Sequence, residues 1–154
     1  MNDLAERVLS VLQGRTLVTA ESCTGGWIGK ALTAIPGSSD VFKGGIICYA
    51  NWVKENVLSV TKDALEQYGA VSENVAMQMA NGARNLLKAD IAVSVTGLAG
   101  PGADAYGNEI GTVYIGYCDS QISLVKAYCF KGVRESVRLQ AVEAALELIL
   151  QVNE

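Results

Sequence analysis

Histidine is absent from this chain, and its absence excludes several common kinds of active site. A Ser–His–Asp triad needs an imidazole as general base, so a nucleophilic serine here needs another partner, for which lysine is the best candidate. Zinc sites usually combine histidine with closely spaced cysteines, whereas the four cysteines of this chain include no Cys-x-x-Cys pair. The sequence therefore predicts no metal site.

Proline and charged residues are also scarce. The chain has 2 prolines, 18% charged residues and 50% hydrophobic residues, which excludes disorder and predicts a large core. Its net charge of −4 argues against a general nucleic-acid-binding protein, although a local basic pocket stays possible. A chain of 154 residues is the size of one domain, so we expect a single domain over 1–154.

Long apolar runs are missing as well. No run approaches the roughly 18–20 residues that a membrane-spanning helix needs, and the segment Met1–Arg7 lacks the apolar part of a signal peptide. The cysteines are widely separated, which is typical of reduced thiols. We expect a cytoplasmic protein without a membrane partner, with Cys48, Cys118 and Cys129 in its core.

Strand and helix patterns alternate along the chain. Helical patterns cover about 3–13, 51–58, 62–68, 72–87 and 133–152, and a strand followed by a helix covers 16–35. Further strand patterns cover 41–50, 90–96, 112–118 and 122–130, the last two as a hairpin. Asn51, Thr61 and Ser72 are expected to begin helices. The alternation predicts an α/β/α sandwich with a mixed β-sheet and helices on both faces.

The segment Glu21–Gly26 is the most informative motif. Small hydroxyl residues and two glycines stand where a strand turns into a helix, so backbone N–H groups there could receive an anion or a polarised carbonyl oxygen. The alternative is an ordinary helix cap made by Ser22 or Thr24. Cys23 is the one cysteine placed like a nucleophile, although no histidine can activate it.

A second hydroxyl cluster, Pro36–Ser39, follows the helix that the first cluster opens. The two clusters would therefore meet only if the chain or a second subunit brought them together, and Pro36–Ser39 is also good turn chemistry. Lys54 follows a strand and is flanked by Trp52 and Val53. Partial burial would lower its pKa and make it a usable base, whereas a solvated helix lysine would have no such role.

Two further segments suggest a ligand. Arg134 and Arg138 share a face at the start of the last helix, where cations oppose the helix dipole unless they bind something negative. Glu135 could instead pair with Arg138. The segment Thr96–Gly102 follows a strand, where ligands gather in open α/β sheets, but it matches neither a dinucleotide motif nor a P-loop and could be a plain turn.

Taken together, several segments resemble the CinA C-terminal-domain family, which includes the nicotinamide mononucleotide deamidases. The resemblance is collinear over about residues 4–150 and fits the form without a larger N-terminal domain. It rests on Ala20–Gly26, Pro36–Ser39, Tyr49–Lys54, Tyr68–Ser72, Thr96–Pro101 and Gly111–Val113.

The resemblance implies hydrolysis of nicotinamide mononucleotide to nicotinate mononucleotide and ammonia, without metal or organic cofactor. It implies Ser39 as nucleophile and Lys54 as general base, with a homodimer or higher homo-oligomer as the assembly. The hydroxyl of Ser22 or backbone amides would hold the oxyanion, and Arg134 or exposed amides the phosphate. The expected substrate-binding residues are Ser22, Thr24, Gly25, Tyr49, Gly97, Gly100 and Arg134.

The sequence departs from the family pattern at Ala50, Trp52, Val133 and 103–110. A bulky indole two residues from Lys54 could reshape the pocket. These departures motivate the alternative of a non-catalytic regulatory module that binds a pyridine nucleotide. Release of ammonia separates the two hypotheses.

Overall fold

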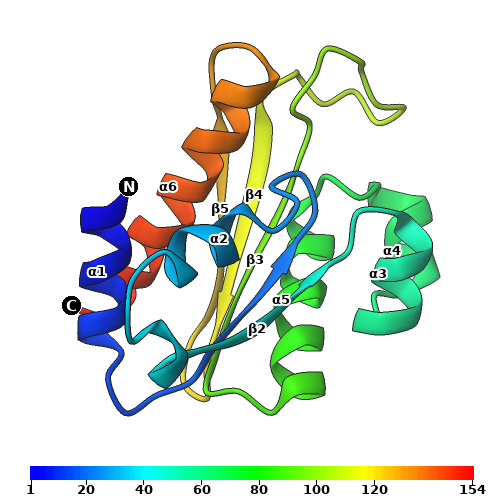
Figure 1. The fold of residues 1–154 in the computed structure, drawn as a ribbon. Helices are drawn as coiled ribbons and strands as arrows, with labels where there is room; N and C mark the ends of the chain where they lie inside the picture. Colours follow the sequence, from blue (N-terminus) through cyan, green and yellow to red (C-terminus); the bar gives the residue numbers. More distant parts are fainter.

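Five strands form one sheet in the computed structural model, which describes residues 1–154 (Figure 1). The strand order is β2-β1-β3-β4-β5. β1 pairs in parallel with β2 and β3, whereas β4 pairs antiparallel with β3 and β5, which confirms the predicted mixed sheet. The strands are β1 Leu17–Glu21, β2 Phe42–Ile47, β3 Ile91–Gly97, β4 Thr112–Cys118 and β5 Ser123–Cys129.

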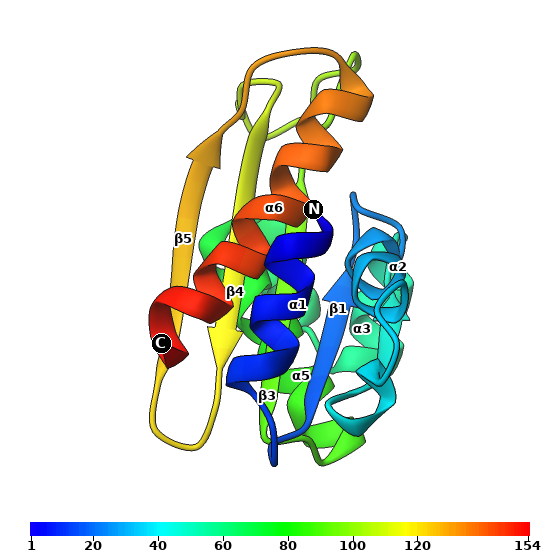
Figure 2. The same cartoon turned by 60° about the vertical axis from the view of Figure 1, so that its left-hand side comes forward.

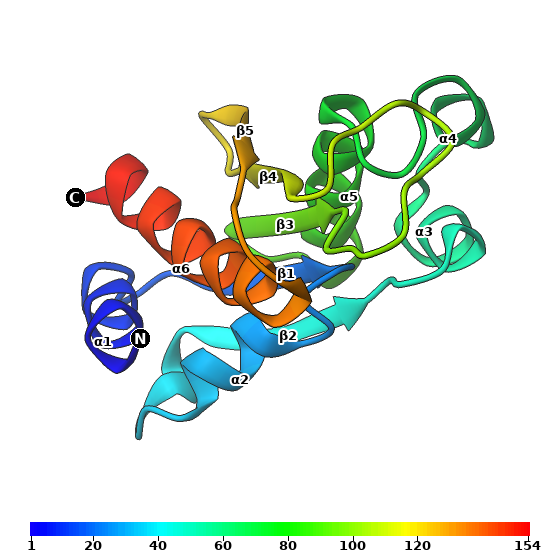
Figure 3. The same ribbon diagram turned by 90° about the horizontal axis from the view of Figure 1, so that it is seen from above.

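Six α-helices cover the two faces of this sheet. They are α1 Asn2–Val11, α2 Trp27–Thr33, α3 Asn51–Leu58, α4 Lys62–Tyr68, α5 Glu73–Leu87 and α6 Arg134–Asn153, and a short 3-10 helix, η1, spans Ser38–Asp40. Helices α1, α2 and α6 lie on one face and α3, α4 and α5 on the other (Figure 3). α1 lies alongside α6 (Figure 2). The predicted α/β/α arrangement is confirmed.

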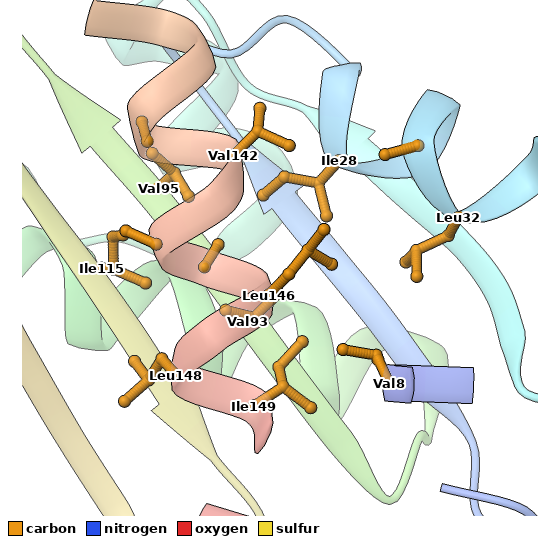
Figure 4. Packing of buried hydrophobic residues seen from close by; sticks show 14 of the residues in the cluster. Val8, Ile28, Leu32, Val93, Val95, Ile115, Val142, Leu146, Leu148 and Ile149 are labelled. Atoms are coloured by element: carbon orange, nitrogen blue, oxygen red, sulfur yellow. The ribbon is translucent and has the colours of Figure 1, made fainter. Parts of the chain in front are cut away.

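Two hydrophobic cores flank the sheet, one on each face. The larger core joins the central strands to α1, α2 and α6 (Figure 4). Its members include Val93, Val95, Ile115, Val142, Leu146 and Ile149. Each fully buried aliphatic side chain of this kind contributes about 1.5–3 kcal/mol relative to exposure, so this face anchors the sheet that carries the site.

The second core is built from small residues of α5, which lets its neighbours approach closely. A Cβ added to Gly82 would lie 1.9 Å from the carbonyl oxygen of Leu58, so the end of α3 sits directly against the α5 backbone. Ala80 and Ala83 of the same helix are buried in this core. This contact holds α3, the helix that carries Lys54, against the sheet layer.

The capping residues predicted from sequence are mostly right. Thr61 Oγ1 accepts a hydrogen bond from the backbone N–H of Ala64 at 3.1 Å, and Ser72 Oγ accepts one from Val75 at 3.3 Å. These bonds satisfy N–H groups that lack a partner in the first helical turn. The prediction for Asn51 is wrong, because Ala50 holds the N-cap position and no side chain caps α3.

Burial departs from prediction at both edges of the sheet. β2 was expected to be buried, but it is an edge strand with alternating exposure, and Ile47 is 57% exposed. Cys129 ends the opposite edge strand, β5, and is exposed, so its predicted place in the core is wrong. Leu86 and Leu87 are also exposed, in the last turn of α5.

Cys23, Cys48 and Cys118 are buried free thiols. None of the six helices combines the length and apolar character that crossing a bilayer requires.

Candidate active site

A cavity of about 380 Å³ opens at the carboxyl ends of β1 and β3. Its walls come from the turn after β1, the segment between β2 and α3, the residues before α5, the loop after β3 and the start of α6. Six of the residues singled out from the sequence line it: Ser22, Tyr49, Lys54, Gly97, Gly100 and Arg134. The fold therefore brings together motifs that lie more than a hundred residues apart in the chain.

Lys54 is the chemically unusual residue of this cavity, because its side chain is buried with 1% exposure. Its Nζ lies 2.9 Å from Ser22 Oγ, 2.7 Å from the carbonyl oxygen of Cys48 and 3.2 Å from that of Tyr49. No carboxylate lies within ion-pair distance. Burial lowers the pKa of Lys54 below its ordinary value of 10.5.

The three oxygens around the Lys54 amine can accept from a charged amine and can also accommodate a neutral one. Carbonyl oxygens only accept hydrogen bonds, so the oxygens of Cys48 and Tyr49 take the two N–H donors of an uncharged amine. The lone pair then faces the hydroxyl of Ser22, which can donate its proton. This arrangement is that of a base aimed at a hydroxyl nucleophile.

Glu21 holds the start of α2 to the end of β1, directly before Ser22, and sequence analysis missed this role. Its carboxylate is 2% exposed and has no cationic partner. Oε1 accepts hydrogen bonds from the Thr24 hydroxyl (2.8 Å) and the Ile28 N–H (2.8 Å). Oε2 accepts hydrogen bonds from the Thr19 hydroxyl (3.0 Å) and the Gly29 N–H (3.1 Å).

These bonds make the Glu21 side chain the cap of α2. Neither Ser22 nor Thr24 caps this helix, so the alternative of an ordinary side-chain cap by those residues is wrong. An acidic residue before a Ser/Thr/Gly-rich turn into a helix was the available signal, because negative charge is favourable at a helix N-terminus. With Glu21 occupied by the helix, the Ser22 hydroxyl is left to Lys54.

Arg134 lines the cavity beside Tyr49 and Gly100. It donates from Nη1 to the carbonyl oxygen of Gly100 (2.8 Å) and from Nη2 to the Tyr49 hydroxyl (3.0 Å). No carboxylate pairs with it, and no acidic side chain lines the cavity. A cavity with an unpaired arginine and no acidic side chain, in a chain of net charge −4, favours an anionic ligand.

Arg138 points away from this cavity. It donates to the carbonyl oxygens of Cys23 (2.9 Å) and Thr24 (3.2 Å), and its guanidinium lies 5.5 Å from the Trp27 ring centroid. The alternative pairing of Arg138 with Glu135 does not form. Arg138 therefore supports the turn that carries Ser22 and does not reach the Lys54 cavity.

Thr24 and Gly25, expected among the substrate-binding residues, do not line the Lys54 cavity. They border a neighbouring hollow of about 350 Å³, together with Trp27, Lys30 and Arg138. The turn after β1 thus presents Ser22 to one hollow and these two residues to the other.

Cys23 does line the cavity, but it is not a nucleophile. Burial raises the pKa of its thiol to about 11, although Arg138 acts in the opposite direction. The thiolate is the reactive form of cysteine, so a protonated, buried Cys23 is a wall residue.

Ser39 lies at the opposite end of β2 from Lys54. It is exposed on η1, before the first residue of the strand, and the Lys43 amine donates to its carbonyl oxygen. The Lys54 amine lies beyond the last residue of the same six-residue strand. At about 3.3 Å per residue, roughly 20 Å separates the two ends, so one chain does not bring Ser39 to Lys54.

The CinA C-terminal domain model matches residues 1–153, so the chain belongs to that family. It is 41% identical to the nicotinamide-nucleotide amidohydrolase PncC of Escherichia coli (strain K12) over 151 residues, covering 96% of this chain and 92% of that protein. A CinA-like protein of Rippkaea orientalis is 48% identical over 149 residues. That match covers 94% of this chain but only 36% of the longer relative.

Solved structures agree with the family assignment. The crystal structure of a competence-damaged protein (CinA) superfamily protein from Klebsiella pneumoniae superposes with a TM-score of 0.94 at 34% identity. The match covers 97% of this chain and 95% of that one. The family resemblance drawn from the motifs, and the fold expected from it, are confirmed.

Proposed function

We propose that this chain is a nicotinamide-nucleotide amidohydrolase that converts nicotinamide mononucleotide to nicotinate mononucleotide and ammonia. The observation that carries the proposal is the buried Lys54 amine, placed against the Ser22 hydroxyl in a cavity with no acidic side chain. The name of the Escherichia coli relative, which this chain matches over 92% of that protein's length, supports the same activity.

The charges of the substrate suit those of the cavity. The phosphate of a mononucleotide can accept hydrogen bonds from N–H groups of Arg134 that its bonds to Gly100 and Tyr49 leave free. The pyridinium ring carries a positive charge, which would further disfavour protonation of Lys54. Substrate binding would therefore favour the basic form of the amine.

The chemistry follows from these placements. Neutral Lys54 takes the Ser22 proton as Oγ attacks the carboxamide carbon, and the tetrahedral intermediate forms. The intermediate collapses as the charged amine gives that proton to the departing nitrogen, which releases ammonia and leaves an ester. Water then attacks the ester with Lys54 as base, which releases nicotinate mononucleotide and restores the Ser22 hydroxyl.

Ser39, the nucleophile that the family resemblance implies, stays a prediction that needs a second copy of the chain. In that arrangement the Ser39 hydroxyl of one protomer would enter the cavity of the other, and Ser22 would hold the oxyanion. Geometry within one chain favours Ser22, because its Oγ already lies 2.9 Å from the Lys54 amine.

Most departures from the family pattern lie outside the cavity. Trp52 is 68% exposed, and neither it, Ala50 nor Val133 lines the cavity walls. The indole therefore does not fill the pocket beside Lys54. This placement favours catalysis over the alternative of a regulatory module that only binds a pyridine nucleotide.

We also propose that the chain forms one domain over 1–154 and works as a cytoplasmic homodimer. Ile47 of the edge strand β2, together with Tyr49 and Trp52 just after that strand, leaves apolar surface exposed, a feature that favours association. Three buried free thiols are consistent with a reducing compartment. Light scattering during size-exclusion chromatography measures the assembly, and a monomer at micromolar concentration would contradict it.

Ammonia release from nicotinamide mononucleotide tests the activity directly. Wild-type protein should release stoichiometric ammonia and nicotinate mononucleotide, and Lys54→Ala should not. Saturable binding of the nucleotide by wild-type protein, with ammonia at the level of Lys54→Ala, would instead establish the binding module.

A further inference from the structure

The segment 98–111, which joins β3 to β4, folds into an ordered strap. Asp104 Oδ1 accepts hydrogen bonds from the backbone N–H groups of Tyr106 (3.0 Å) and Asn108 (3.2 Å). Asn108 Nδ2 donates to Asp104 Oδ2 at 2.7 Å. The first half of the strap lines the cavity, and the second half extends toward α4 (Figure 3).

Tyr106 fastens the strap to the end of α4. Its hydroxyl lies 3.2 Å from the carbonyl oxygen of Leu65 and 2.9 Å from that of Glu66, to which it donates. The Leu65 carbonyl oxygen already accepts from the N–H of Gly69, whereas that of Glu66 is one of the carbonyls that the end of a helix leaves without a helical partner. The hydrogen bond to Glu66 attaches the strap to a rigid element.

The tyrosine ring packs on Gly69, the residue after α4. A Cβ at Gly69 would lie 2.5 Å from the ring of Tyr106, and the backbone there has φ +79°, a conformation that favours glycine. The ring therefore fits only where position 69 has no side chain. Tyr106 and Gly69 form a complementary pair next to Ala70 and Val71, which line the cavity.

The same strap contacts two parts of the cavity wall. Asn108 Nδ2 donates to the carbonyl oxygen of Val71 (3.1 Å), a residue of one part. The other part is formed by 97–103 and is tied to Arg134 through the carbonyl oxygen of Gly100. The separation of the two parts is thus set by contacts that run through Tyr106 and Asn108.

We propose that Tyr106 is a specificity-determining residue, which clamps the strap onto Gly69 and so limits the cavity to mononucleotide-sized substrates. This inference rests on the proposed function. A substrate with a second nucleotide on its phosphate needs room beyond a cavity of about 380 Å³. With the clamp in place, the strap cannot move away from Val71 to provide that room.

The test compares nicotinamide mononucleotide with nicotinamide adenine dinucleotide as substrates. For Tyr106→Ala, the ratio of kcat/KM for the two should fall about 10-fold in favour of the dinucleotide, since loss of the ring and its hydrogen bonds frees the strap. Tyr106→Phe keeps the ring on Gly69 and should give a smaller change. The matched control is Tyr68→Ala, one residue from Gly69, which should leave the ratio unchanged.

Hydrogen exchange provides a readout that does not depend on activity. In the absence of substrate, Tyr106→Ala should accelerate amide exchange in both 98–111 and 65–71, and Tyr68→Ala should not do so in 98–111. Unchanged exchange in the strap would show that Tyr106 does not restrain segment 98–111 and would overturn the inference. Faster exchange with an unchanged substrate ratio would overturn it as well.

A failure of the proposed function would be visible separately. If wild-type protein releases no ammonia, calorimetric binding of the mononucleotide and the dinucleotide replaces kcat/KM. A wild-type preference for the mononucleotide that shrinks in Tyr106→Ala supports the clamp. Equal binding of the two by wild-type protein, an unchanged preference or no binding contradicts it.

Discussion

The two ends of β2 carry the same pair of residue types in opposite settings. At the carboxyl end, the buried Lys54 amine lies against the hydroxyl of Ser22. At the other end, the exposed Lys43 amine donates to the backbone carbonyl of Ser39. Only the first pair places a desolvated amine against a serine hydroxyl, so the environment distinguishes the two pairs as candidates for catalysis.

The largest contrast is expected between the two serines. If Ser22 is the nucleophile, Ser22→Ala should lower kcat at least 10³-fold, because the covalent step has no other hydroxyl within reach of Lys54. Ser39→Ala should then change kcat less than about twofold. Initial rates of ammonia release measure both, and circular dichroism checks that each variant is folded.

Mixed dimers test whether Ser39 acts across subunits. When Ser39→Ala and Lys54→Ala are co-expressed, a trans arrangement gives one complete site per mixed dimer, so activity should reappear in otherwise inactive material. In a cis arrangement with Ser22 as nucleophile, Ser39→Ala is already active and mixing only dilutes it. An inactive Ser39→Ala that is rescued by mixing would overturn the role proposed for Ser22.

Substitutions of Lys54 and Lys43 should differ nearly as strongly in their effects on kcat. Lys54→Ala removes the general base and should lower kcat about 10²–10⁴-fold. Lys43→Ala removes an exposed amine and should stay within about twofold of wild type. Comparable losses in the two variants would show that burial of the amine is not what distinguishes the two ends of β2.

The fold followed from local patterns, because its elements are specified by short-range chemistry. The alternation of strands and helices, the caps at Thr61 and Ser72 and the hairpin of β4 and β5 were all predicted. Edge positions were not, since Ile47 and Cys129 have the composition of buried strands. Strand order decides which strands become edges, and composition does not encode it directly.

The residues of the site could be predicted from motifs, but their arrangement in space could not. Lys54, Tyr49 and Arg134 were singled out, and the structure places all three on one cavity. The distance between Ser39 and Lys54 depends on which end of β2 each residue occupies, which the resemblance alone does not state. The role of Glu21 rests on four hydrogen bonds to nearby residues, for which the acidic residue before the turn into α2 was the one sequence signal.

An acidic residue near each end of β2 offers a third comparison: Glu21 near the carboxyl end and Asp40 before the first residue. Glu21→Gln keeps the shape of the buried side chain but places an NH₂ donor against backbone N–H donors, which should lower the free energy of unfolding by about 1–3 kcal/mol. Asp40→Asn, at an exposed position of η1, should change it by less than about 0.5 kcal/mol. Urea titrations measure both, and equal effects would contradict the role given to Glu21.

The smallest expected effect is on the pH dependence of the free energy of unfolding. Burial lowers the pKa of Lys54 in the folded state below 10.5, so between the two values the unfolded chain binds a proton that the folded chain does not. Stability should therefore rise with pH in that window through this residue, and Lys54→Met should remove that rise.

Activity should follow the same ionisation. The neutral amine is the base, so kcat/KM should fall about tenfold per unit as pH drops below the lowered pKa of Lys54 and level off above it. Lys43→Met should leave both profiles unchanged, because that amine is exposed. A rate profile with an acid limb centred at 10.5 or above would mean that the amine stays charged in the cavity, and Lys54 could then not accept the serine proton at neutral pH.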